Sequence, residues 1–283
     1  MGLLVSVARG AVPPRFQPLV KSARRSVLRV RYRGEGVVCP CCNGRFRAFR
    51  TAGVGTKREG ALCPGCGSWE RHRLLWLFLA ARTSFFSEQL ELLHVAPEPV
   101  LQQRFRALPN VSYTSIDLRS PLADIPMDVT ELLFADGYFD AVICVHVLDH
   151  VSDDRKAMQE LHRVLRPGGL AIVMCPTKHE PTIEDPCVVS AQDRERIYGH
   201  RDRVRLYGPD LGDRLAATGF DVEIVPYTSE LDPSTVERHG LLVSDDLYVL
   251  RKRAGASESN LVHALGARVT AARREPGEQS ASP

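Results

Sequence analysis

The sequence has no long hydrophobic run. Nowhere do eighteen apolar residues follow one another, so we expect no membrane-spanning helix. The first ten residues, MGLLVSVARG, are apolar for only a few positions before Arg9, which is too short for the hydrophobic region of a signal peptide. We therefore expect a cytoplasmic protein, in a reducing compartment where cysteines serve metal binding or packing before disulfides.

Acidic residues are missing from residues 1–34, which hold eight Arg or Lys. Residues 1–75 carry 15 Lys/Arg against 3 Asp/Glu, a net charge of +12, and the remainder carries 22 against 31, a net of −9. This asymmetry suggests an anionic partner for the basic arm, either RNA or a membrane surface in peripheral contact. Pro13, Pro14 and Pro18 disfavour regular structure early in the arm, and a solvated or weakly amphipathic helix is the simplest interpretation of the rest.

Four of the eight cysteines form two C-x2-C pairs, Cys39 with Cys42 and Cys63 with Cys66, separated by 20 residues. Each pair brings two thiolates to one side of a tight turn, and two such pairs complete the tetrahedron that zinc prefers. Four thiolates leave no open coordination position, so we expect a structural zinc ion. Two alternatives remain: Cys41 replaces a neighbouring ligand, or the cysteines only pack.

The stretch between the cysteine pairs combines basic residues with the aromatics Phe46 and Phe49. Such a combination can bind RNA by phosphate contact and base stacking, although a solvated hairpin is the simpler interpretation. After the second pair, residues 67–81 read GSWERHRLLWLFLAA and are apolar on nearly all sides of a helix. We expect this helix to pack between the zinc module and a larger domain.

The core of the larger domain is indicated by residues 139–151, FDAVICVHVLDHV. The run Ala141–Val145 does not alternate with polar residues, which predicts a strand buried on both faces of a parallel sheet. His146, Asp149 and His150 follow at its carboxyl end. Ligands of open α/β sheets bind at those ends, so these side chains are candidate site residues.

A strand–helix–strand unit continues from there. Ser152, followed by Asp153 and Asp154, predicts a helix start, and Arg166–Gly169 predicts its end. The next buried strand is Leu170–Pro176. Parallel strands joined by a helix form a right-handed βαβ unit.

This unit, with its VLRPGG and LAIVMCP segments, resembles the fourth and fifth strand region of class I S-adenosylmethionine (SAM) dependent methyltransferases. The resemblance extends over roughly residues 90–252. The CPxC pairs and CGSWERHRLLW resemble a bacterial subgroup with an amino-terminal zinc ribbon. The resemblance implies an α/β fold, a doubly wound seven-stranded mostly parallel sheet whose last two strands, FDVEIV and DLYVLRK, form an antiparallel edge, with a small zinc-ribbon module. The implied organisation is a basic segment 1–34, a zinc ribbon 35–68, a connecting helix 69–89, a methyltransferase domain 90–253 and a disordered tail 254–283.

The resemblance also implies a set of SAM-binding residues. Class I methyltransferases place a glycine-rich turn after the first strand, whereas this chain has Ala96, Pro97 and Glu98, the "APE" variant typical of the subgroup. Glu98 is expected either to bond the ammonium or ribose of SAM or only to start the next helix. Asp117 is expected to accept the ribose hydroxyls, a turn-forming aspartate being the alternative. The residues implied near adenine are Asp128 and Val129, and His146 lines the cofactor.

Catalytic and substrate roles are implied for two further groups. His146, Asp149 and His150 are candidate general bases for an oxygen or nitrogen acceptor, because a histidine titrates near pH 6.5; packing or capping is the alternative role. The long charged segment 182–207 predicts a lid or binding loop. Its YGHRDRVRLYG resembles a subgroup signature, with Arg203 where histidine is usual. The expected substrate residues are Asp202, Arg205 and Tyr207, unless they form a structural ion-pair cluster.

These expectations favour a SAM-dependent methyltransferase for a small molecule or glycan-type acceptor. Two other functions stay open. The zinc ribbon and basic arm suit an RNA methyltransferase, which would lose RNA binding at raised salt. The missing glycine turn suits a scaffold that does not turn over SAM, although the presence of Asp117, Asp128 and His146 argues against this.

Overall fold

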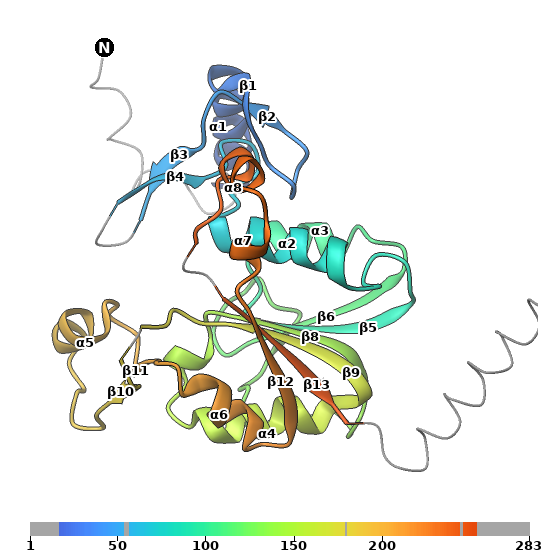
Figure 1. Ribbon diagram of the computed structural model, residues 1–283, viewed down its shortest axis with the longest axis vertical. Coiled ribbons are helices and arrows are strands. Elements are labelled where there is room, and N and C mark those ends of the chain that lie inside the picture. Colours follow the sequence, from blue (N-terminus) through green and yellow to red (C-terminus); the bar gives the residue numbers. More distant parts are fainter. Residues whose placement is uncertain (1–16, 54–56, 179, 244–245, 254–283) are drawn as a thin grey trace, which may run out of the picture.

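The computed structural model describes residues 17–53, 57–178, 180–243 and 246–253 (Figure 1). The expected disordered tail, 254–283, and the proline-rich start of the basic arm lie outside these residues. No helix in the described ranges is long and apolar enough to cross a membrane.

The main body is a seven-stranded sheet in the order β12-β13-β9-β8-β5-β6-β7. Its strands are β5 Leu90–Val95, β6 Val111–Asp117, β7 Ile125–Pro126, β8 Phe139–Val145, β9 Leu165–Met174, β12 Phe220–Val225 and β13 Leu247–Lys252. Neighbours from β9 to β7 run parallel, whereas β13 is antiparallel to both β9 and β12. This confirms the predicted class I methyltransferase fold with its antiparallel edge.

Helices cover both faces of the sheet (Figure 1). They are α2 Glu70–Arg82 and α3 Pro99–Phe105 on one face, and α4 Asp154–Val164 and α6 Leu211–Ala216 on the other. Val142 and Cys144 of β8 pack in the cluster with α4 and α6, whereas Ala141, Ile143 and Val145 pack in the cluster with α2 and α3. The unbroken apolar run of β8 therefore reflects burial on both faces, and each fully buried large side chain contributes about 1.5–3 kcal/mol.

The boundaries of α4 differ from the prediction. Asp153 is the N-cap in place of Ser152, and its side chain accepts a hydrogen bond from the backbone N of Lys156 at 2.9 Å. The helix ends at Val164 and β9 begins at once, so Arg166–Gly169 belongs to the strand. There the pairing of β8 with β9 shifts register, and this irregularity accommodates the Pro-Gly-Gly sequence within the sheet.

The amino-terminal module consists of a helix and two small antiparallel sheets. Its elements are α1 Gln17–Arg31, β1 Arg33–Val38 paired with β2 Arg45–Phe46, and β3 Arg50–Ala52 paired with β4 Arg58–Leu62. Arg73 of α2 is fully buried and donates hydrogen bonds to the carbonyl oxygens of Ala61 and Ser68 in the module and of His239 in α8 (Pro233–His239). The helix α2 therefore lies between the module and the body, as its apolar surface predicts.

The segment 182–207 carries secondary structure of its own. It contains β10 Ile183–Glu184, α5 Ala191–Tyr198 and β11 Arg205–Leu206, and β10 pairs with β11. Figure 1 places this unit beside one end of the main sheet. The remaining helix of the body is α7 Tyr227–Glu230.

Candidate functional site

A cavity of about 710 Å³ opens at the carboxyl ends of β5, β6 and β8. The order of the sheet reverses between β5 and β8, where doubly wound proteins bind their ligands. The lining residues that the sequence predicted are Ala96, Asp117, Asp128, Val129, His146, His150 and Asp202. The predicted residues that do not line it are Pro97, Glu98, Asp149, Arg205 and Tyr207.

Two residues on the cavity wall have left-handed backbone conformations. Ala96, directly after β5, has φ 51°, and His146, directly after β8, has φ 54°. The backbone N of Ala96 donates to the carbonyl of Ile116 at 2.8 Å, and that of His146 donates to Met174 at 2.7 Å. A left-handed residue with a Cβ costs roughly 1–2 kcal/mol, and such strain gathers at functional sites. The turn after β5 thus has a glycine-like conformation without a glycine.

Asp117, the last residue of β6, and Asp128, which follows β7 by two positions, both line the cavity. Oδ1 of Asp117 accepts hydrogen bonds from the backbone N of Arg119 and of Ser120, at 2.7 and 2.6 Å. Oδ1 of Asp128 accepts from both the backbone N and the hydroxyl of Thr130, at 2.9 Å each. Asp117 therefore forms a turn and also borders the cavity, which combines the two alternatives considered for it.

Glu98 lies behind the cavity wall, between two histidines. Its Oε1 is 2.9 Å from Nε2 of His72, and its Oε2 is 3.4 Å from Nε2 of His94. Because Nδ1 of His72 accepts from the backbone N of Trp69, Nε2 of His72 carries the proton and donates to Glu98. Burial alone would raise the pKa of Glu98, but His72 and His94 reverse this and hold it well below 4.5. Glu98 thus joins the loop after β5 to α2.

The three candidate bases have different surroundings. Burial, assisted by the charge of Arg71, lowers the pKa of His146 well below 6.5, so this histidine is neutral at pH 7 and can accept a proton. Asp149 is fully buried, and its Oδ2 accepts a hydrogen bond from Nε of Arg203 at 2.7 Å. The same oxygen lies 3.5 Å from Nε2 of His150. Asp149 can orient His150 from behind, while both histidines face the cavity.

Arg205 and Tyr207 are buried beneath the loop that follows β8. Arg205 donates hydrogen bonds to the backbone carbonyls of Leu148, Val151 and Ser152. The hydroxyl of Tyr207 donates to Oδ2 of Asp154 at 2.7 Å, and burial raises its pKa. Together with Glu184 and Arg214, these side chains form an ion-pair cluster. Arg205 thereby holds the loop that carries His150. Of the three predicted substrate residues, Asp202 lines the cavity.

Two cationic residues at the cavity were not singled out from the sequence. Arg119 lies two positions after Asp117, and Arg194 comes from α5. Arg194 donates to the carbonyl of Val188 at 3.1 Å. The prediction of a binding loop at 182–207 contained the only signal for Arg194, because nothing in its local sequence separates it from the other charged residues of that segment.

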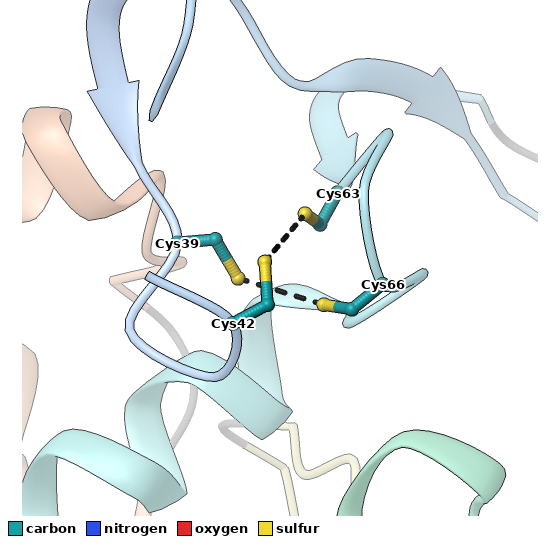
Figure 2. Close-up of side chains that lie close together, drawn as sticks. All are labelled: Cys39, Cys42, Cys63 and Cys66. Atoms are coloured by element: carbon teal, nitrogen blue, oxygen red, sulfur yellow. Dashed lines mark hydrogen bonds between the residues drawn. The ribbon is translucent and has the colours of Figure 1, made fainter. Parts of the chain in front are cut away.

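The four predicted zinc ligands meet at one point in the module. Figure 2 shows the sulfur atoms of Cys39, Cys42, Cys63 and Cys66 directed toward one another, and all four lie within 4.8 Å of one another. The Sγ atoms of Cys39 and Cys66 are 3.7 Å apart, and those of Cys42 and Cys63 are 3.9 Å apart. The thiol of Cys41 instead donates to the carbonyl of His72, so it is not part of the cluster.

The aromatic residues between the cysteine pairs are inside the module. Phe46 and Phe49 are 3% and 5% exposed, and Phe49 packs against the guanidinium of Arg73. Neither ring is available to stack on a base. The hypothesis of base stacking by these two residues is therefore wrong, and the module offers only its charges to a nucleic acid.

Residues 87–173 match a family described as "Methyltransferase domain". This segment is similar to methyltransferase domains. The match covers almost all of β9 and the whole of β5, β6 and β8, the three strands at whose carboxyl ends the cavity opens. The seven-stranded sheet to which these strands belong has the class I methyltransferase fold.

The domain is similar to curated proteins over limited stretches. A probable SAM-dependent methyltransferase of Mycolicibacterium smegmatis is 27% identical over 112 residues, which are 39% of this chain and 37% of that protein. A 2-phytyl-1,4-naphtoquinone methyltransferase of Nostoc punctiforme is 42% identical over 53 residues, 19% of this chain and 23% of that protein. The chain spans between 15% and 50% of the length of such relatives. Among solved structures, a SAM-dependent methyltransferase of Mesorhizobium loti is similar with a TM-score of 0.47 and 16% identity, over 63% of this chain and 98% of that one.

Proposed function

We propose that the protein is a SAM-dependent methyltransferase that transfers a methyl group to an oxygen or nitrogen of a small molecule or glycan-type acceptor. The observation that carries this proposal is the cavity at the carboxyl ends of β5, β6 and β8, lined by Asp117, Asp128 and His146 within the methyltransferase domain. A scaffold that had lost its cofactor would have no need of strained residues at Ala96 and His146.

The cavity residues suit the parts of SAM. Asp117 would accept the ribose hydroxyls, since no hydrogen bond from the described residues reaches its Oδ2. Asp128 and Val129 would border the adenine, and the left-handed conformation of Ala96, just before Pro97, would let the backbone approach the cofactor. Glu98 would act from behind this turn, holding it through His72, in place of a direct bond to the ammonium.

Methyl transfer needs mainly alignment and removal of a proton. SAM, when bound, supplies both the methyl group and its leaving group. The chain would position the acceptor and take its proton. His146 is neutral at pH 7, and His150 is oriented by Asp149, so either imidazole suits the role of general base. Asp202 and Arg194, at the cavity from segment 182–207, would bind polar groups of the acceptor.

The cysteine cluster would hold a structural zinc ion. Four sulfurs at about 2.3 Å from zinc form a tetrahedron with edges of about 3.8 Å, close to the Sγ–Sγ separations of 3.7 Å for Cys39 and Cys66 and 3.9 Å for Cys42 and Cys63. With four thiolates the ion would have no position for a substrate. Its role is therefore to stabilise the module that supports α2.

The decisive experiment is calorimetric titration of zinc-replete protein with SAM and with S-adenosylhomocysteine. We expect micromolar binding that Asp117→Ala abolishes. Asp213→Ala is the matched control, because Asp213 is an exposed aspartate of α6 outside the cavity. Failure of folded wild-type protein to bind either compound would overturn the proposal, whereas binding would justify a screen of acceptors.

A further inference from the structure

A second pocket lies between α1, the cysteine cluster and α3. It has a volume of about 270 Å³, and three arginines line it: Arg25 and Arg29 from α1 and Arg104 from α3. The other lining residues are Ser26, Cys42, Gly65, Cys66, Val100 and Gln103. Among the residues that the structure describes, no carboxylate belongs to this lining.

Arg104 is held in place but lacks a complete set of acceptors. Its guanidinium carbon lies 5.5 Å from the centre of the Trp76 ring, and Trp76 in turn stacks on Phe105 at 5.9 Å. The Nε of Arg104 is buried and has no hydrogen-bond acceptor among the residues described. A buried donor without an acceptor is costly, so an oxygen-bearing ligand in the pocket would stabilise this arrangement.

The arginines are more numerous than the cysteine cluster requires. One zinc ion with four thiolates carries about two negative charges, which nearby cations can offset. Arg73 is already buried beside the cluster, since it donates to the carbonyl of Ser68 while Oγ of Ser68 lies 3.2 Å from Sγ of Cys39. With Arg73, the pocket arginines bring four positive charges to this region. Charge balance of the metal site therefore leaves a surplus at the pocket.

We propose that this pocket binds a phosphate group. Several guanidinium groups without a competing carboxylate are a typical phosphate site, because their N–H donors match phosphate oxygens and form charge-assisted hydrogen bonds. A small phosphate ester and an RNA backbone present the same group. Since Phe46 and Phe49 are buried, RNA would be held through its phosphates without base stacking. The inference assumes the zinc of the proposed function but does not depend on methyl transfer.

The helix α3, which lines the pocket, follows the cavity wall closely in the chain. Ala96 lines the cavity, and α3 begins three residues later at Pro99. Val100, Gln103 and Arg104 of the same helix line the arginine pocket. A phosphate-bearing ligand anchored here would therefore contact the helix that follows the cofactor turn.

The test uses the full-length, zinc-replete protein without SAM. Inorganic phosphate and a short single-stranded RNA are titrated separately, with tryptophan fluorescence as a readout because Trp76 contacts Arg104. We expect Arg104→Gln and Arg29→Gln each to weaken binding about tenfold or more, the effect of losing a charged hydrogen bond. Arg24→Gln is the matched control, because Arg24 is an exposed arginine of α1 outside the pocket lining.

Each outcome decides something. RNA binding that phosphate displaces would identify the ligand as a nucleic-acid backbone, and RNA binding no tighter than phosphate would identify a small ester. If Arg24→Gln weakened ligand binding as much as Arg104→Gln and Arg29→Gln, the attraction would come from the general positive charge, and the proposal would be overturned. The proposal would also be overturned if neither phosphate nor RNA bound to the wild-type protein. Zinc content and thermal melting of each variant show whether the module is intact. Should Arg104→Gln not fold, the exposed Arg29 decides the question.

Discussion

The Oε1 atom of Glu98 lies 2.9 Å from Nε2 of His72. Glu98 ends the loop that begins at Ala96 on the cavity wall, and His72 belongs to α2, which follows the second cysteine pair directly in the chain. This hydrogen bond joins the cofactor loop to the helix that carries the amino-terminal module. The module therefore supports the cavity without contributing a lining residue to it.

The substitution Glu98→Gln is expected to destabilise the protein by about 1–3 kcal/mol at pH 7, because it removes a charged partner from two buried histidines. The folded-state pKa of Glu98 is depressed below 4.5, so its contribution is complete above this pH and is lost as the pH falls through the folded pKa. Urea unfolding at about pH 7 and about pH 3 measures the difference. Glu88→Gln, at an exposed position, is the control. If the free energy of unfolding differs between wild type and Glu98→Gln by the same amount at both pH values, this prediction is wrong.

The substitution Ala96→Gly is expected to stabilise the fold by about 0.5–1 kcal/mol. Glycine removes the strain of the left-handed conformation, which stabilises the folded state by roughly 1–2 kcal/mol. It also increases the conformational entropy of the unfolded chain, which favours unfolding by about 0.4–1 kcal/mol. Ala80→Gly, on the exposed side of α2, should instead cost about 1 kcal/mol. Thermal or urea unfolding distinguishes the two. Destabilisation by both changes would mean that Ala96 is not strained.

The substitution Cys42→Ser is expected to abolish stoichiometric zinc binding, whereas Cys41→Ser should retain about one zinc per chain. The reason is geometric, because the thiol of Cys41 faces the carbonyl of His72 and not the cluster. Metal analysis of purified variants measures the ratio. Chelation of wild-type zinc should also weaken SAM binding through α2. If both variants lost zinc, Cys41 would be needed for zinc binding, and the prediction would be wrong.

The substitution Arg203→Ala is expected to destabilise the protein by about 3–5 kcal/mol, because it leaves the fully buried Asp149 without its cationic partner. Arg201→Ala should change stability by less than about 1 kcal/mol, since its ion pair with Glu195 is exposed. Urea unfolding compares the two. A small effect of Arg203→Ala would show that this buried ion pair contributes little to the stability of the folded protein.

Much of the fold was predictable because it depends on local patterns. The apolar run of β8 predicted burial on both faces, and the spacing of the two cysteine pairs predicted that their four sulfurs meet in one cluster. The site was predictable where a residue lies at the carboxyl end of a strand, as Asp117 does at the end of β6 and His146 does directly after β8. The end of α4 was harder to predict, because the Pro-Gly-Gly sequence is compatible both with the end of a helix and with an irregular strand. Only its pairing with β8 made this sequence part of a strand.

The sequence by itself determined the buried strand β8, the residues at its carboxyl end and the pairing of the four cysteines, since periodicity and spacing act over a few residues. Tertiary structure alone decided which distant side chains meet. Glu98 forms a hydrogen bond with His72, 26 positions away in the sequence, and Arg203 forms one with Asp149, 54 positions away. Such pairs depend on how loops close and helices cross the sheet, so no periodic pattern in the sequence predicts them. The same is true of the arginine pocket, whose cations come from α1 and α3 and converge only because the module folds against the body.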